Sequence, residues 1–122
     1  MLIFVYGTLK KSMRNHYHLQ NIIDDKNCIP VSTVDLYPMY SSGYDFPFLE
    51  NQPGTGKIIK GELWNVPEEN IHYLDSFEGV PSLYVRGEIE VECENFKYIV
   101  GVYFRSESTK INLEKCISEW FD

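Results

Sequence analysis

Two neighbouring stretches of alternating residues constrain the fold of this chain most strongly. Residues 83–93 alternate between an apolar and a polar face, and residues 96–105 do the same after a break at 94–95. A period of two is typical of strands with one buried face, and a two-residue break between two such strands predicts a β-hairpin. The expected apolar faces consist of Leu83, Val85, Ile89 and Val91 in the first strand and Phe96, Tyr98, Val100, Val102 and Phe104 in the second.

Three more strands are predicted ahead of this hairpin. Residues 2–6 are apolar on both faces, which indicates a central, fully buried strand. Residues 28–36 are rich in Val, Ile and Thr, and residues 57–66 follow a Pro-Gly turn, so both are expected to be strands. Residues 37–56 between them are predicted to form a long irregular loop, unusually rich in aromatic residues, that packs on the domain or covers a site.

Helices are predicted over residues 12–23, 67–78 and 111–121, where apolar residues recur at helical spacing. The strands are joined by hairpin signals rather than by regular helical crossovers. We therefore expect an α+β fold, with a small, mixed, strongly twisted β-barrel flanked by two or three helices. The length of 122 residues fits a single domain over residues 1–122.

Charge and cysteine content narrow the functional class. Eighteen acidic and 11 basic residues give a formal net charge of −7, which argues against binding to nucleic acid or to an anionic membrane. The three cysteines, Cys28, Cys93 and Cys116, are far apart, so we expect free thiols in a reducing compartment. Residues 1–6 are too short and lack the basic region of a signal peptide. We therefore expect a cytoplasmic protein.

Two further patterns are better explained by structure than by ligand binding. His16 and His18 are two residues apart and have no third ligand nearby, so no metal site is expected. The Gly-rich turn at residues 53–57 does not have the spacing of a phosphate-binding loop, and Ile58 stands where that motif needs a hydroxyl.

Glu78 is the main candidate for acid–base chemistry. It lies at the end of the predicted helix 67–78, which Gly79 terminates. Because Glu78 follows Ile71 by seven residues and Leu74 by four, it shares the face that packs inward. Burial and the negative end of the helix dipole would both raise the pKa of its carboxyl group. The alternative is that the helix frays one residue early and Glu78 points to water.

Gly7 is a candidate for close ligand approach. It follows the buried strand directly, and the next residues are Thr8 and Leu9. Successive backbone N–H groups in such a turn can form a concave site for a carboxylate or a phosphate. The alternative is an ordinary turn at the exit of a strand.

Three side chains of the predicted hairpin share the face opposite to its apolar one. Tyr84 and Arg86 point the same way and are close in sequence to Glu78, and Tyr103 lies on the corresponding face of the second strand. These residues either approach Glu78 or lie on an outer polar surface.

Two motifs in the chain resemble the γ-glutamylcyclotransferase-like (AIG2-like) superfamily. They are Phe4-Val5-Tyr6-Gly7-Thr8-Leu9-Lys10 and Leu74-Asp75-x-Phe77-Glu78-x-x-Pro81-x-x-Tyr84-x-Arg86. The resemblance covers nearly the whole chain and includes Tyr37-Pro38, Pro53-Gly54-x-Gly56 and Gly61-Glu62-Leu63. Within the superfamily the spacing is most similar to the γ-glutamylaminecyclotransferase branch.

The resemblance implies a cofactor-independent enzyme that acts on a small molecule. It would convert a γ-glutamyl amine, such as γ-glutamyl-ε-lysine, to 5-oxoproline and a free amine, by attack of the substrate's own α-amine on the γ-carbonyl. Glu78 would be the acid–base residue. The substrate's α-carboxylate would bind the backbone of Tyr6, Gly7, Thr8 and Leu9.

The roles of the remaining polar residues are open at this point. Tyr84 or Tyr103 would donate to the developing oxyanion. Arg86 would orient Glu78 or pair with an outer acid. The aromatic passage 37–50 is expected to form the wall that meets the leaving group.

Two alternative functions also fit the sequence. The first is a γ-glutamylcyclotransferase acting on γ-glutamyl amino acids or glutathione, whose extra carboxylate would be met by Lys10, Lys11 or Arg14. The second is a non-catalytic sensor that keeps the carboxylate-binding loop. An intact Glu78 argues against the sensor, because a module without catalysis needs no inward-facing acid.

Overall fold

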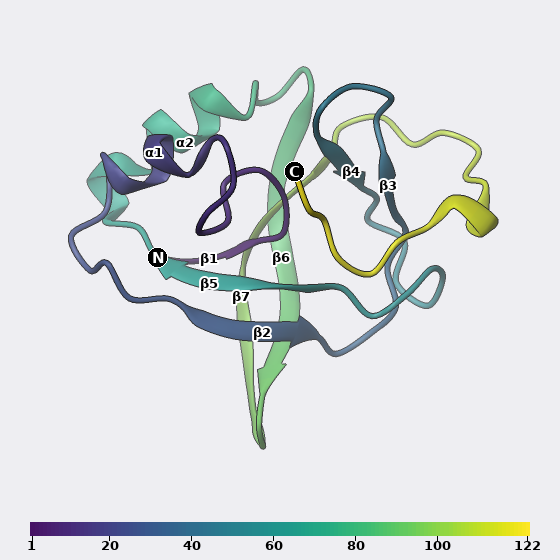
Figure 1. The fold of residues 1–122 in the computed structure, drawn as a ribbon, viewed down its shortest axis with the longest axis horizontal. Helices are drawn as coiled ribbons and strands as arrows, with labels where there is room; N and C mark the ends of the chain where they lie inside the picture. Colours follow the sequence, from purple (N-terminus) through teal and green to yellow (C-terminus); the bar gives the residue numbers. More distant parts are fainter.

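The centre of the molecule is a closed, five-stranded barrel, seen in the computed structural model, which describes all residues 1–122 (Figure 1). Its strands are hydrogen-bonded in the order β1-β5-β2-β6-β7. Strand β1 is antiparallel to β5 and parallel to β7, so the barrel is mixed, as predicted. The strands are β1 (Leu2–Val5), β2 (Ile29–Thr33), β5 (Lys60–Asn65), β6 (Tyr84–Cys93) and β7 (Phe96–Arg105).

The apolar side chains divide into two cores. Phe4 and Tyr6 belong to the core inside the barrel, together with residues from every other strand. Ile3 and Val5 point the other way and pack with Leu74 in a second core between the barrel and the helices. This division explains why the first strand is apolar on both faces.

The hairpin of β6 and β7 has the predicted turn, with Cys93 opposite Phe96. Its far end projects beyond the barrel (Figure 1). Ile89 and Val91 are buried as expected, but Phe96 is 65% exposed because no strand covers the projecting end. At the other end of the hairpin Val85 is exposed too, whereas Tyr84 on the opposite face is buried.

The predicted loop 37–56 contains a hairpin that the sequence did not indicate. Strands β3 (Met39–Ser41) and β4 (Pro47–Leu49) pair antiparallel beside the barrel. Each has three residues, too few for a period of two to be recognised. Of the aromatic residues in this passage, Tyr37 and Phe48 are buried, whereas Tyr44 is exposed to solvent.

The helices are shorter than predicted. The first, α1 (His16–Gln20), covers five residues of the expected 12–23. The second begins as a 3₁₀ turn at Glu68–Asn70 and continues as α2 (Ile71–Phe77). None of these helices is long enough to cross a membrane.

The predicted closing helix 111–121 is wrong. Only Leu113–Lys115 form a 3₁₀ turn, and the chain then runs along the barrel. Ile117 donates its N–H to the Met39 carbonyl at 2.8 Å, and Ser118 accepts from Lys60 at 2.8 Å. These long-range backbone bonds replace the local bonds that a helix would have made. The three cysteines are free thiols, as expected.

Candidate active site

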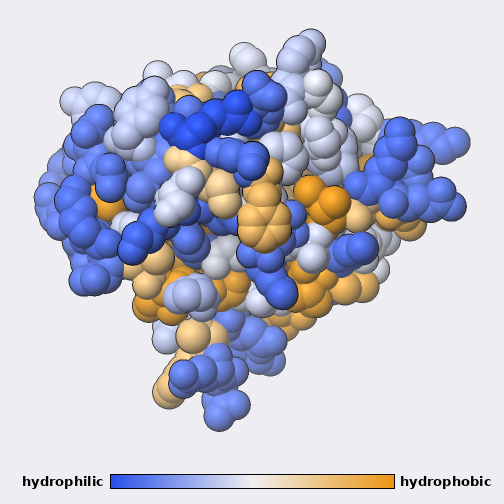
Figure 2. Space-filling model, viewed as in Figure 1, coloured by the Kyte–Doolittle hydropathy of each residue, from blue (hydrophilic) through white to orange (hydrophobic).

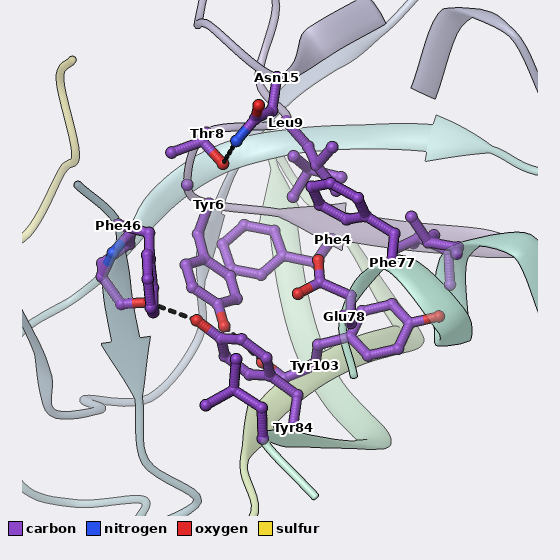
Figure 3. A pocket seen from close by; sticks show the side chains of 16 residues that line it. Phe4, Tyr6, Thr8, Leu9, Asn15, Phe46, Phe77, Glu78, Tyr84 and Tyr103 are labelled. Carbon is purple, nitrogen blue, oxygen red and sulfur yellow. Dashed lines mark hydrogen bonds between the residues drawn. The ribbon is translucent and has the colours of Figure 1, made fainter. Parts of the chain in front are cut away.

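A pocket of about 220 Å³ lies between the end of β1, the end of α2 and the β3–β4 hairpin. Sixteen residues line it, and 11 of them are hydrophobic. Figure 3 shows the labelled side chains around the space. The pocket brings together every site residue predicted from sequence except Arg86, namely Tyr6, Gly7, Thr8, Leu9, Glu78, Tyr84 and Tyr103.

The C-terminal end of α2 fixes the position of Glu78. Gly79 donates its N–H to the Ser76 carbonyl at 3.1 Å, and Val80 donates to the Asp75 carbonyl at 3.0 Å. This pair of bonds is the Schellman motif, which needs a left-handed residue just past the helix. Gly79 supplies it with a φ of 69°. Glu78 is therefore held as the C-cap residue that directly follows Phe77, so the helix ends one residue earlier than predicted, but the side chain of Glu78 does not point to water.

The carboxyl group of Glu78 points into the pocket (Figure 3). Burial raises its pKa from the ordinary 4.5 to about 8, and no hydrogen bond or ion pair contributes to the shift. The expected helix-dipole effect is not needed to explain the value. A carboxyl group that titrates near neutral pH can both accept and donate a proton, which is the property required for acid–base catalysis.

The loop after β1 lines the same pocket with residues whose backbone donors are unpaired. The N–H groups of Gly7, Thr8 and Leu9 donate to no acceptor within the protein. The loop is nevertheless held in place, because Asn15 donates from Nδ2 to Thr8 Oγ1 at 3.0 Å and from its backbone to the Thr8 carbonyl at 3.0 Å. Three consecutive free N–H groups suit a carboxylate ligand.

Gly7 makes a close contact that the sequence did not reveal. Its φ is not positive, so the turn does not require a glycine for its conformation. A Cβ at this position would lie 3.2 Å from both Cγ and Cδ of Pro47. The missing side chain lets the β3–β4 hairpin pack closely against the loop.

Three tyrosines surround Glu78, and each donates its hydroxyl proton to another protein group. Tyr6 donates to the Tyr103 carbonyl, Tyr84 to the Pro47 carbonyl at 2.7 Å, and Tyr103 to Asp75 Oδ1 at 2.6 Å. Burial is the main cause of a raised pKa in all three, and the charge of Glu78 adds to it. These hydroxyls stay protonated at neutral pH.

Tyr103 and Tyr84 differ in the direction of their hydroxyl groups. The Tyr103 hydroxyl is directed away from the pocket, and its ring forms part of the wall near Glu78 (Figure 3). Arg86 lies outside the pocket, with Nη2 3.6 Å from Asp75 Oδ2. Of the two roles considered for Arg86, the structure thus places it beside an outer acid rather than beside Glu78.

Several pocket residues were not identified from sequence. They are Asn15, Phe46, Pro47, Leu74, Phe77 and Leu83, together with the β1 residues Ile3, Phe4 and Val5. Phe46 and Pro47 come from the aromatic passage that was expected to form a wall. Asn15 directly precedes α1, but its side chain bonds Thr8 and does not cap the helix.

The basic residues near the loop do not face the pocket. No lysine or arginine lines it. Lys10 is buried and donates to the Trp120 carbonyl, and Arg14 pairs with Asp45 and Asp122. No group of three His, Cys, Asp or Glu side chains is arranged to hold a metal ion. Instead, His16 is buried, with Nδ1 2.7 Å from the Leu9 carbonyl.

Comparison with known proteins points to one family. A family described as "Gamma-glutamyl cyclotransferase, AIG2-like" matches residues 3–120. The chain is 41% identical over 95 residues to gamma-glutamylaminecyclotransferase A of Danio rerio, which covers 74% of this chain and 58% of the relative. It is 35% identical over 94 residues to gamma-glutamylaminecyclotransferase of Homo sapiens, which covers 75% of this chain and 61% of the relative.

A solved structure has the same fold. The crystal structure of an AIG2-like protein from Mus musculus superposes with a TM-score of 0.79 at 29% sequence identity. The alignment covers 88% of this chain and 78% of the mouse chain. In the sequence comparisons, by contrast, the chain matches only about three fifths of the length of the two curated relatives named above.

Proposed function

The chain belongs to the gamma-glutamyl cyclotransferase, AIG2-like family, and we propose that it converts γ-glutamyl amines to 5-oxoproline and a free amine. The observation that carries the proposal is the pairing of two groups in one apolar pocket. One is the carboxyl group of Glu78, with a pKa of about 8, and the other is the loop with three free N–H groups.

A γ-glutamyl substrate fits these two groups in one orientation. Its α-carboxylate binds the N–H groups of Gly7, Thr8 and Leu9. Its α-ammonium then lies beside Glu78, whose carboxylate form it stabilises. The γ-carbonyl folds back toward the α-nitrogen, and the pocket holds the substrate in the conformation that leads to attack.

The reaction needs one proton carrier. Glu78 takes a proton from the α-ammonium, and the free amine attacks the γ-carbonyl to form the new C–N bond of a five-membered ring. The bond between the γ-carbon and the leaving nitrogen breaks as Glu78 returns this proton to that nitrogen. Glu78 then takes the second proton from the ring nitrogen and passes it to the released amine, which leaves as an ammonium ion. Two protons thus move from the α-nitrogen to the leaving nitrogen, both through Glu78, and no co-reactant is needed.

Only one of the two candidate tyrosines is placed to donate a hydrogen bond to the oxyanion. Tyr84 is the better candidate to donate to the oxyanion, because Tyr103 directs its hydroxyl to Asp75 outside the pocket. To do so, Tyr84 has to exchange its bond to the Pro47 carbonyl for one to the stronger, charged acceptor.

The absence of a cation in the pocket lining favours an amine over an amino acid as the leaving group. A γ-glutamyl amino acid or glutathione would bring a further carboxylate with no cation beside it to the mouth of the pocket, whereas the carboxylate of γ-glutamyl-ε-lysine lies at the far end of the lysine chain, next to an α-ammonium group. Of the three cations that the sequence offered for it, Lys10 and Arg14 are bound to other groups, and Lys11 is exposed and does not line the pocket. An anion near Glu78 would meet an uncompensated negative charge.

The test is release of 5-oxoproline from a panel of substrates. It contains a γ-glutamyl alkylamine, γ-glutamyl-ε-lysine, a γ-glutamyl amino acid and glutathione. We expect kcat/KM to be at least about tenfold higher for the two amine substrates. This ratio corresponds to a difference of about 1.4 kcal/mol in the free energy of the transition state. Preference for glutathione or the γ-glutamyl amino acid would overturn the assignment. Binding of 5-oxoproline without turnover of any substrate would instead favour a sensor.

A further inference from the structure

Residues 116–122, here called the C-terminal strap, hold the outer side of the loop that carries the free N–H groups. Figure 1 shows the strap, in yellow, ending beside the purple loop that follows β1. On this face hydrophilic side chains cover most of the surface, with a few apolar groups between them (Figure 2). The strap makes two separate contacts with the loop, through Lys10 and Arg14.

The first contact is made by a buried lysine. Lys10 is 5% exposed, and its Nζ donates to the Trp120 carbonyl at 2.6 Å. The same ammonium group lies 5.3 Å from the centre of the Phe121 ring, within cation–π range. Burial lowers the pKa of Lys10, although nearby acids act in the opposite sense. Lys10 directly follows Leu9, so its position sets that of the last free N–H group.

The second contact joins Arg14 to Asp122. The backbone N–H of Arg14 donates to the Asp122 side chain, whose other oxygen lies 3.8 Å from Arg14 Nε. Trp120 Nε1 donates to the same carboxylate at 3.1 Å, which fixes its direction. Arg14 directly precedes Asn15, the residue that bonds Thr8.

The strap is itself anchored to the barrel. Cys116 is buried, Ile117 donates to the Met39 carbonyl, and Ser118 accepts from Lys60 in β5. The loop is therefore fixed to the barrel from outside as well as through β1. A loop that offers backbone donors to a ligand gains affinity when its geometry is set before the ligand arrives.

We propose that the C-terminal strap positions the carboxylate-binding loop, with Lys10 and Asp122 as its positioning residues. Neither touches the substrate, and both act through the loop. The inference rests on the proposed function, because it assigns the strap a role in holding the γ-glutamyl carboxylate. It also explains why two basic residues beside a carboxylate site face away from it.

Three variants test the proposal: Lys10→Met, Asp122→Ala and, as the matched control, Lys11→Met, whose side chain is exposed. Binding of 5-oxoproline is measured by calorimetry, KM and kcat with γ-glutamyl-ε-lysine, and Tm by circular dichroism. We expect Lys10→Met and Asp122→Ala each to raise Kd and KM about tenfold with kcat within about twofold, the pattern of lost binding shared by ground and transition state. Lys11→Met should match the wild type.

Asp122→Ala separates positioning from a direct effect of charge. Removing a negative charge near an anion site would tighten anion binding if charge alone mattered. Positioning predicts the opposite sign, weaker binding. Unchanged or tighter binding in this variant overturns the proposal, as does a fall in Tm without any loss of affinity. If the wild type neither binds 5-oxoproline nor turns over substrate, it is the proposed function that fails.

Discussion

Replacing Glu78 by Gln should stabilise the protein, and the gain should grow with pH. The pKa of Glu78 is about 8 in the native state against 4.5 ordinarily. Below pH 4.5 Glu78 is protonated in both the folded and the unfolded state, so its ionisation costs no stability there. Because the pKa is raised in the folded state, the free energy of unfolding falls as the pH rises from 4.5 to 8. Each pKa unit corresponds to about 1.4 kcal/mol, so the loss is at most about 5 kcal/mol.

Glutamine keeps the shape of the protonated side chain and does not ionise. The free energy of unfolding of Glu78→Gln should therefore equal that of the wild type near pH 4.5. It should exceed the wild-type value by about 1.4 kcal/mol per pH unit above that, up to pH 8. The assay is urea unfolding, followed by tryptophan fluorescence, at intervals from pH 4.5 to 9.

The control is Glu88→Gln, which alters an exposed carboxylate on β6. Its free energy of unfolding should differ from the wild type by about 0.5 kcal/mol or less at every pH, as is usual for surface changes. A difference between Glu78→Gln and wild type that stays flat from pH 4.5 to 8 would refute the raised pKa and with it the acid–base assignment.

Three further predictions concern catalysis and stability. The value of kcat/KM should fall about tenfold per pH unit below about pH 8, because free Glu78 must be ionised to take a proton; a flat profile down to pH 6 would contradict this. Gly56→Ala should lower Tm much more than Gly54→Ala: both positions have a φ above 90°, but only at Gly56 does a Cβ lie 2.3 Å from a backbone oxygen. Equal shifts would show that φ alone matters. Arg105→Met should cost about 3 kcal/mol in urea unfolding, because it removes the only cation paired with Glu50, which is 1% exposed; a loss below about 1 kcal/mol would count against the pair.

The long strands and the acid were predictable because local patterns determine them. The hairpin of β6 and β7 follows from period-two alternation, and Glu78 follows from its spacing to Leu74 and from Gly79. These signals are short-range, so the chain displays them directly.

The remaining features depend on contacts between distant segments. Residues 111–121 carry helical spacing, yet their backbone bonds go to Met39 and Lys60, which no local pattern indicates. Arg86 shares a face with Tyr84, but the pocket ends between them, and only the fold sets that boundary. From the sequence, Lys10 is a candidate for a free cation beside the site. In the structure it is buried, because the strap covers it.

The central claim is that Glu78 moves the proton in a cyclisation that releases 5-oxoproline. The most direct test compares wild type and Glu78→Gln with γ-glutamyl-ε-lysine at saturation, while 5-oxoproline binding is measured on both proteins. We predict a loss of kcat of at least about 10³-fold in the variant, with product binding retained, since the loop is unchanged. Turnover by Glu78→Gln within about tenfold of wild type would contradict the account.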